Sequence, residues 1–157
     1  MTAMTASDAA DLPAPDPRPV VEARLGAAGQ RYTRSRAALI EVLAASDAPL
    51  TVDEIVARDD QLALSTAYRN LVVFESCGVV HRIVTADEHA RYELDEELTE
   101  RHHHHLVCSR CGTVRDFTVP DTLEDELDRA LVRVARSFGF DAQHHRLDLV
   151  GRCSSCR

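Results

Sequence analysis

Apolar residues recur at helical spacing in the first half of the chain. Residues 1–19 are rich in Ala, Asp and Pro, so we expect a disordered or extended tail there. A short helix is predicted from about residue 20 to 28, where Gly29 stops it. A second helix is predicted to begin at Thr33 or Ser35. Its apolar face comprises Ala38, Leu39, Val42 and Leu43.

Capping residues locate two further helices. Thr51 and Glu54 have the spacing of a capping box, which predicts the start of a third helix. Ser65 is a candidate N-cap for a fourth helix. That helix is predicted to end at Cys77 and Gly78, because glycine readily adopts the left-handed conformation that closes a helix.

Two short strands are predicted after the fourth helix. Residues 79–84 and 91–94 flank a polar turn at 86–89, as in a β-hairpin. Three helices, a capped fourth and a hairpin are the element order of a winged helix-turn-helix. The segment 59–64 would be the turn.

The second half of the chain predicts strand, strand, helix and strand. Residues 106–119 alternate as a strand or hairpin, and 144–152 alternate again. Between them, 121–138 is predicted to be an amphipathic helix that Asp121 and Glu124 cap and Gly139 ends. Its apolar stripe comprises Leu123, Leu127, Leu131, Val134 and Ala135.

The predicted fold class is α+β, an N-terminal winged helix-turn-helix followed by a small C-terminal α/β dimerisation domain with a four-cysteine zinc site. We expect a tail at 1–19, a DNA-binding domain at 20–84, a hinge at 85–97, and a dimerisation and metal-binding domain at 98–157. The last domain is too small to bury much core alone, so metal binding and dimerisation would supplement it.

Composition and charge narrow the class. The chain has 157 residues, 45% of them hydrophobic, and its apolar runs are far shorter than the roughly 20 residues of a membrane helix. No secretory signal pattern begins it, so we expect a cytoplasmic protein with no membrane partner. The net charge of −8 argues mildly against nucleic-acid binding. However, Arg31, Arg34, Arg36 and Arg69 lie in the N-terminal half, whereas acidic residues gather at 87–100 and 116–128.

Four of the five cysteines form two C-x-x-C pairs. Two such pairs complete a tetrahedral, closed zinc site of structural type, although a redox role and unrelated buried cysteines are alternatives. A closed site leaves no open position for a zinc hydrolase or a deaminase. The expected structural Zn²⁺ ligands are Cys108, Cys111, Cys153 and Cys156.

Four consecutive histidines precede the first cysteine pair. Alternate side chains of a strand point to opposite faces, so His102 and His104 would face one way and His103 and His105 the other. One strand could therefore serve two metal sites, since imidazole suits zinc, iron(II) and related ions.

Taken together, these motifs resemble the ferric uptake regulator family. The resemblance rests on Ser65-Thr-Ala-Tyr-Arg-Asn-Leu71, Tyr92-Glu-Leu94, the histidine run leading into Leu-Val-Cys-x-x-Cys-Gly112, and His145 before the last cysteine pair. It covers roughly residues 20–157. It implies a homodimeric, metal-dependent repressor of metal-uptake genes that binds double-stranded DNA at a palindromic operator.

The resemblance also implies site residues. The DNA contacts would include Tyr68 and Arg69 on the recognition helix and Arg31 in the minor groove, which fits the usual docking of such helices. The remainder of the expected DNA-binding set is Ser65 and Thr66.

A regulatory metal, Fe²⁺ or Zn²⁺, is implied between the domains at Glu93, His103 and His105. Several members draw a further histidine from the DNA-binding domain, but Pro49 occupies the matching position here. His81 and His89 are our preferred replacements. Cys77 is a softer alternative that is more simply explained as a buried side chain.

A third site within the dimerisation domain is implied at His102, His104, a carboxylate of the long helix and His145. Glu124 is the first choice for that carboxylate and Asp128 the second, and His144 would point away. Two alternative functions stay open. One is a peroxide-sensing repressor of the same family, which an oxygen-rich site would favour, and the other is a zinc-ribbon protein-interaction adaptor.

Overall fold

The computed structural model describes residues 15–157 apart from 86, 100 and 101, so most of the expected tail lies outside the described residues. The first helix, α1 (Arg18–Ala27), begins after Pro17 with a proline in its first turn. It therefore starts two residues before its predicted start at about residue 20, because proline fits the first turn of a helix. The second helix, α2 (Arg34–Ala44), begins at the N-cap Thr33, whose side chain accepts a hydrogen bond from the amide of Arg36.

The next two helices differ in how they are capped. The predicted capping box opens α3 (Val52–Ala57), with the Thr51 amide 2.7 Å from Glu54 Oε2. The predicted cap of α4 (Leu64–Ser76) is wrong, since Ala63 is the N-cap and Ser65 already lies inside the helix. At the other end, Cys77 is the C-cap and Gly78 has φ +67°, as predicted.

The first sheet is antiparallel in the order β1-β3-β2. It contains β1 (Leu50–Thr51), β2 (Val80–Val84) and β3 (Ala90–Leu94), with β3 in the centre. The two-residue β1 is too short for its pattern to be recognised in sequence. The range 85–97, expected to be a hinge, thus contains the central strand, and only the segment from Asp95 onward links the sheets. A one-turn helix, α5 (Glu96–Thr99), lies in that link.

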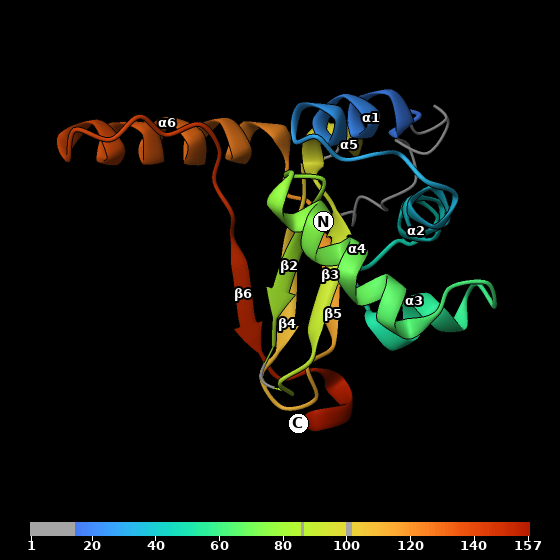
Figure 1. The fold of residues 1–157 in the computed structure, drawn as a ribbon. Coiled ribbons are helices and arrows are strands. Elements are labelled where there is room, and N and C mark those ends of the chain that lie inside the picture. The colour runs from blue at the N-terminus through green and yellow to red at the C-terminus, as the bar shows by residue number, and fades with distance from the viewer. Residues whose placement is uncertain (1–14, 86, 100–101) are drawn as a thin grey trace.

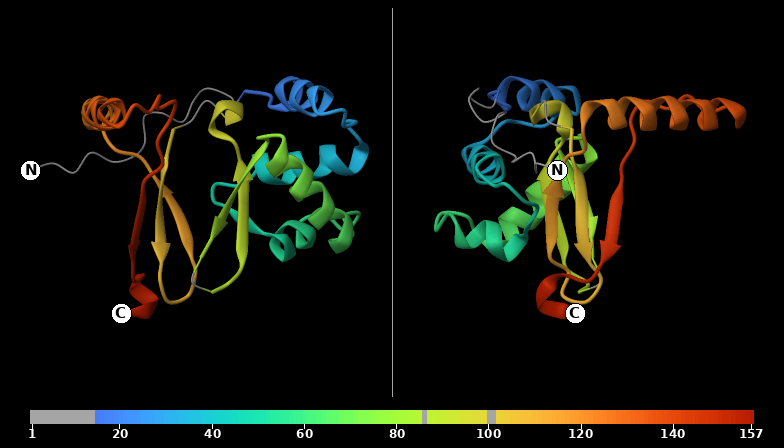
Figure 2. Two further views of the ribbon diagram at one scale, coloured as in Figure 1. Left: turned by 60° about the vertical axis from the view of Figure 1, so that its left-hand side comes forward. Right: turned by 180° about the vertical axis from the view of Figure 1, so that it is seen from behind.

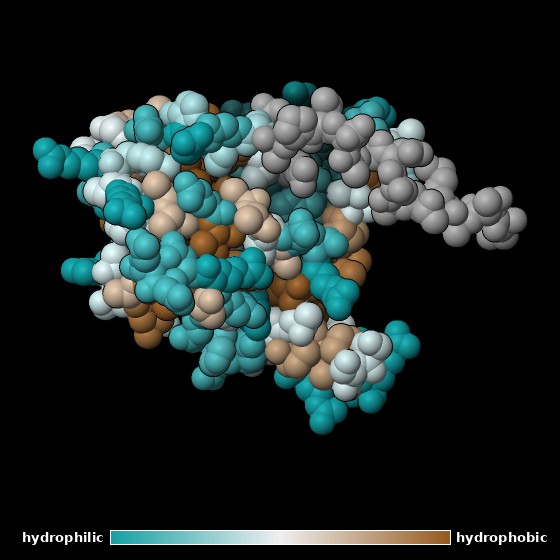
Figure 3. Space-filling model, turned by 90° about the vertical axis from the view of Figure 1, so that its right-hand side faces the viewer, coloured by the Kyte–Doolittle hydropathy of each residue, from teal (hydrophilic) through white to brown (hydrophobic). Residues whose placement is uncertain are grey.

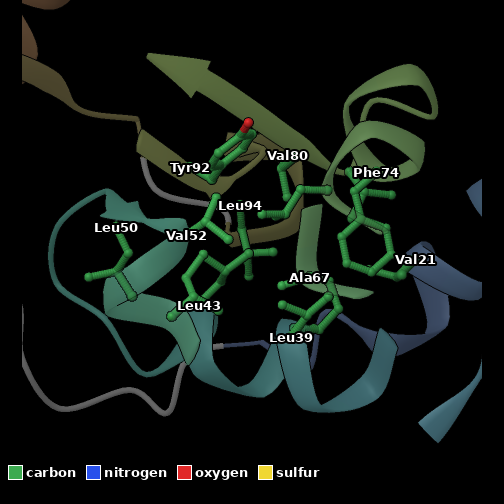
Figure 4. Close-up of a cluster of buried hydrophobic side chains, with 14 of the residues drawn as sticks. Val21, Leu39, Leu43, Leu50, Val52, Ala67, Phe74, Val80, Tyr92 and Leu94 are labelled. Carbon is green, nitrogen blue, oxygen red and sulfur yellow. The ribbon is translucent and has the colours of Figure 1, made fainter. Parts of the chain in front are cut away.

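The hydrophobic core lies between this sheet and the helices packed on it. Val21 of α1, Leu39 of α2 and Phe74 of α4 are fully buried and lie in one cluster with Leu94 of β3 (Figure 4). The apolar face predicted for the second helix, Ala38, Leu39, Val42 and Leu43, therefore packs in this core.

The second sheet has the order β5-β4-β6, and the histidine run and both cysteine pairs lie in its strands or directly beside their ends. It contains β4 (His104–Cys108), β5 (Val114–Phe117) and β6 (Asp148–Gly151). The first two strands form an antiparallel hairpin, and β6 runs parallel to β4, so the predicted strand at 144–152 is paired only over its second half. A short 3-10 helix, η1 (Ser154–Cys156), ends the chain.

The crossover from β5 to β6 is made by α6 (Asp121–Ser137). The predicted cap is wrong here too, because Pro120 is the N-cap and makes no side-chain cap bond. The helix projects from the rest of the molecule and buries none of its residues (Figure 1). Its apolar stripe is exposed, with Leu123 at 50% and Val134 at 55%. An exposed apolar stripe of this kind is typical of a surface that another chain covers.

The two sheets lie side by side (Figure 2). At one end, the turn between β2 and β3 contacts the turn between β4 and β5: a side chain at Gly112 would overlap the carboxylate of Asp87. The face seen in Figure 3 is largely hydrophilic, with apolar side chains between the polar ones. No helix in the described part of the chain is long and apolar enough to cross a membrane.

Candidate metal centres and nucleic-acid interface

The first candidate metal centre, the cysteine cluster, consists of Cys108, Cys111, Cys153 and Cys156. Their four sulfur atoms lie within 4.8 Å of one another, where the turn after β4 meets η1. Backbone N–H groups of Cys111, Cys153 and Arg110 lower the pKa of Cys108 to about 6. Hydrogen bonds to Cys153 and Cys111 raise the pKa of Cys156 to about 12, since a further thiolate among them needs a compensating cation. Four converging thiols of this kind fit a tetrahedral zinc ion.

The second centre, the helix cluster, consists of His102, His104, Glu124 and His145. Its three imidazoles turn their Nε2 atoms to one carboxylate. His102 and His145 Nε2 lie 3.0 Å from Glu124 Oε1, and His104 Nε2 lies 2.9 Å from Oε2. Glu124 is held there by the first turn of α6. Three imidazoles and one carboxylate are a donor set that suits zinc or iron(II).

Three buried atoms of the helix cluster lack hydrogen-bond partners: His104 Nδ1, Glu124 Oε1 and His145 Nε2. The last two face each other without hydrogen-bond geometry. A buried polar atom without a partner is costly, and a bound cation would satisfy Glu124 Oε1 and His145 Nε2 together. Asp128 instead lies behind the cluster, 2.8 Å from Nδ1 of His145. The geometry thus makes Glu124 the central carboxylate and Asp128 an outer one.

The third centre, the hinge cluster, consists of Glu93, His103, His105 and Asp116. Both oxygens of Glu93 lie 3.1 Å from Nε2 of His105, and one lies 3.2 Å from Nε2 of His103. The two Nε2 atoms also lie 3.9 Å from the carboxylate of Asp116. Two imidazoles and two carboxylates around one point fit a divalent metal ion.

Burial and charge shape the hinge cluster. Burial raises the pKa of Glu93, but hydrogen bonds from His103 and His105 outweigh that effect and bring it to about 2. Burial likewise raises the pKa of Asp116 above its ordinary value. Burial lowers the pKa of His105, yet Glu93 and Asp148 overcome this and raise it. The cluster therefore concentrates negative charge in a partly desolvated position, where it attracts a cation.

The hinge cluster joins the two halves of the molecule. Glu93 belongs to β3, the central strand of the first sheet, whereas His105 on β4 and Asp116 on β5 belong to the second sheet, with His103 just before β4. An ion held by all four would tie the first sheet to the second.

The structure does not bring the preferred replacement histidines into the hinge cluster. His81 is the register partner of Glu93, but its Nε2 lies 2.8 Å from Asp95, whose carboxylate attracts it instead. His89 precedes Glu93 by four residues, which is about 13 Å along an extended strand. Cys77 packs against the hydrophobic core at the end of α4, as its simpler interpretation held.

Asp116 is the cluster member that sequence reasoning missed. The register of the β4–β5 hairpin pairs it directly with His105. Folding the chain about the Cys108–Cys111 turn would have revealed this pairing, since residues directly opposite in an antiparallel pair share a face. His144 is exposed and outside every cluster, as expected.

The expected nucleic-acid-binding residues gather around α4. Arg31, Thr66 and Arg69 line one cavity of about 430 Å³ between the loop before α2 and the first turns of α4. Arg36, which is buried, also lines this cavity and donates a 3.0 Å hydrogen bond to Asn70 on α4. Tyr68 is 49% exposed outside it, and Ser65 is exposed at the start of the helix.

The fold and these sites define a class of protein: a winged-helix regulator with clustered metal ligands. The family model of the ferric uptake regulators matches residues 27–150. A peroxide-responsive repressor, PerR of Staphylococcus epidermidis, is 31% identical over 139 residues, covering 86% of this chain and 87% of the relative. The chain therefore belongs to the ferric uptake regulator family, whose members are DNA-binding, metal-binding transcription regulators and not enzymes.

Solved structures support the same assignment. The ferric uptake regulator of Vibrio cholerae is similar with a TM-score of 0.63 and 28% identity, over 84% of this chain and 98% of that one. A zinc-bound manganese uptake regulator is similar with a TM-score of 0.56 and 31% identity, over 85% and 98%. The α+β fold with its N-terminal winged helix is thus confirmed, and the adaptor alternative is set aside.

Proposed function

We propose that this protein is a transcriptional repressor of metal-ion homeostasis that binds a palindromic operator in double-stranded DNA as a homodimer when a divalent ion fills the hinge cluster. One observation carries the proposal: the hinge cluster draws Glu93 from the first sheet and its other members from the second. Metal binding and the orientation of the DNA-binding unit are then the same event.

The chain's own residues would perform the switch. A bound divalent cation would supply the positive charge that keeps Glu93 and Asp116 near each other despite their repulsion. Glu93 then fixes β3, and with it α4, relative to the second sheet and to the partner protomer. Two recognition helices held at a fixed separation match two half-sites of an operator. A coupling of about 1–3 kcal/mol would change DNA affinity about 5- to 150-fold.

The donor sets favour particular ions. The cysteine cluster would hold a structural Zn²⁺ and the hinge cluster a regulatory Fe²⁺ or Zn²⁺. Asp116 gives the hinge cluster as many oxygen as nitrogen donors, whereas the sequence suggested a site richer in nitrogen. Additional oxygen ligands favour harder ions, which supports Fe²⁺ over Zn²⁺.

The DNA contacts would come from α4 and the loop before α2. Arg31 and Arg69 would contact the phosphates or base edges around their shared cavity, and the exposed Tyr68 would pack on thymine methyl groups. Ser65 and Thr66, in the first turn of α4, complete the set. Replacement of Tyr68 by alanine should abolish operator binding with folding intact.

The experiment that tests the proposal measures metal content and DNA binding together. We expect one Zn²⁺ per protomer to survive mild chelation, and a second, removable ion to restore binding to a palindromic promoter fragment. Glu93→Ala combined with His105→Ala should retain the tight zinc and the dimer but lose the metal dependence. The matched control is Glu126→Ala with His144→Ala, a carboxylate and a histidine outside the clusters. Metal-independent DNA binding by the unaltered protein would reject the proposal.

Peroxide sensing is a second candidate, because Asp116 makes the hinge cluster richer in oxygen and a 31% identical relative is a peroxide-responsive repressor. Hydrogen peroxide would then oxidise a carbon of His103 or His105 in the Fe²⁺-loaded protein. One oxygen atom is added to the ring, and water is the other product. Mass spectrometry of the treated protein separates the candidates: only a peroxide sensor gains that oxygen atom as it loses DNA binding.

A further inference from the structure

Glu96, at the start of α5, lies between the hinge cluster and the helix cluster. Its Oε2 lies 2.7 Å from Nδ1 of His102, a member of the helix cluster. Its Oε1 lies 4.0 Å from Nδ1 of His103, a member of the hinge cluster. The side chain is 29% exposed, so the carboxylate is partly shielded from solvent. One carboxylate thus contacts a histidine from each cluster.

A carboxylate in this position orients a metal ligand. When the Nδ1–H of a histidine donates a hydrogen bond to a carboxylate, Nε2 keeps the lone pair that can bind a metal ion. The hydrogen bond also holds the ring in one orientation. His102 has this arrangement, since its Nδ1 faces Glu96 and its Nε2 lies 3.0 Å from Glu124. Removal of such an outer partner typically lowers metal affinity about 10- to 100-fold.

Two other carboxylates act on single histidines. Asp128 lies 2.8 Å from Nδ1 of His145, and Asp148 lies 3.1 Å from Nδ1 of His105. Each serves one cluster only. Among the described residues, Glu96 is the outer carboxylate that lies within 4.0 Å of a histidine from each cluster.

Glu96 is also close to the hinge cluster along the chain. It follows Glu93 by three residues and lies in the segment from Asp95 onward that links the two sheets. Holding Glu96 against His102 therefore holds the link, and with it the end of β3 that carries Glu93.

We propose that Glu96 is a positioning residue that couples the two histidine clusters, so that metal in the helix cluster raises the metal affinity of the hinge cluster. The inference rests on the proposed function for the role of the hinge cluster, and it assigns that site a regulator. Because the coupling is a free energy between two binding events, metal in the hinge cluster equally raises the affinity of the helix cluster.

The test is a metal titration of the full-length dimer with its cysteine cluster loaded. Zn²⁺ is titrated against a chromophoric chelator, and the step that Glu93→Ala with His105→Ala removes is assigned to the hinge cluster. Glu124→Ala with His145→Ala disables the helix cluster. When Glu96 is present, we expect this double substitution to lower the affinity of the hinge cluster for Zn²⁺ about 5- to 150-fold. In a Glu96→Ala background the same double substitution should change the Zn²⁺ affinity of the hinge cluster by less than about twofold.

Asp128→Ala is the matched control. It removes a carboxylate at nearly the same distance from a helix-cluster histidine, so it should weaken the helix cluster and leave the coupling intact. Glu96→Gln should retain part of the coupling, since its amide oxygen still accepts the Nδ1–H of His102. Circular dichroism shows whether each variant is folded.

The outcomes separate this inference from the proposed function. Coupling that persists in Glu96→Ala, or is lost equally in Asp128→Ala, overturns the role of Glu96 whatever DNA binding shows. Coupling that depends on Glu96 supports it even if DNA binding ignores metal, a result that would reject the proposed function alone. A hinge cluster that takes up neither Zn²⁺ nor, in an anaerobic titration, Fe²⁺ overturns both.

Discussion

Arg36 shows how one buried charge organises the surface that we propose contacts DNA. Its guanidinium is 9% exposed and donates to Asn70 Oδ1 at 3.0 Å, to the Arg31 carbonyl at 2.6 Å and to Gln30 Oε1 at 3.0 Å. These bonds tie α2 both to α4 and to the loop that carries Arg31. A buried charge whose hydrogen bonds are all satisfied favours the one arrangement of the surrounding residues that satisfies them.

We therefore predict that Arg36→Met lowers the free energy of unfolding by about 1–3 kcal/mol, because it leaves buried acceptors on Asn70 and Arg31 without donors. Urea unfolding measures the loss. The control is Arg34→Met on the same helix, since Arg34 is exposed and should be nearly neutral. Equal effects of the two substitutions would contradict the role of Arg36.

Asp87 provides a pH-dependent contribution to stability. Hydrogen bonds from Arg91 and Thr85 hold the pKa of Asp87 well below its ordinary value of 3.8. A carboxyl group with a lowered pKa in the folded state stabilises it above the unfolded pKa, and this is lost as pH falls toward the folded pKa. The difference in free energy of unfolding between the unaltered protein and Asp87→Asn should thus be constant above about pH 5 and shrink below pH 3.8. Urea unfolding across that range measures it; a pH-independent difference would count against the ion pair.

At the scale of elements, the contact between the two hairpin turns depends on Gly112. This glycine has φ +70°, and a Cβ there would overlap Asp87, which Arg91 holds in place. Gly139 has φ +71° with nothing within 4 Å of its Cβ position. A comparison of the two glycines therefore distinguishes backbone strain from the contact with Asp87.

Gly112→Ala and Gly139→Ala should share a backbone cost of about 1–2 kcal/mol. We predict a further loss of stability for Gly112→Ala only, measured by urea unfolding, because the added methyl group displaces Asp87. In an Asp87→Ala background that further loss should disappear. If the further loss persists in that background, the strain lies within the turn between β4 and β5. The contact between the two turns then contributes nothing to stability.

At the scale of the whole molecule, α6 needs a partner. Leu131 is 37% exposed on the apolar stripe of a helix that buries no residue. We predict that Leu131→Glu yields a monomer, since a dimer would bury two unpaired carboxylates. Sedimentation velocity measures the change. Arg133→Glu, on the opposite side of α6, should leave the dimer intact, and a dimeric Leu131→Glu variant would place the interface elsewhere.

The sequence by itself determined the features that depend on neighbouring residues. The apolar spacing predicted the first two helices and capping residues the next two, and the capping box at Thr51 and the glycine after Cys77 mark helix ends that the structure also has. Strand alternation separated His102 and His104 from His103 and His105, and the structure brings each pair into a different cluster. Such features are local, because capping and periodicity act within a few residues.

Tertiary structure alone decided which distant groups meet. The pairing of β4 with β5 brought Asp116 to His105, while Asp95 drew His81 away from Glu93. The pairing of β3 placed Glu93 in the first sheet. The helix α5 in the link between the sheets placed Glu96 between the two histidine clusters. These contacts join residues through strand register and packing, which no short window of sequence contains.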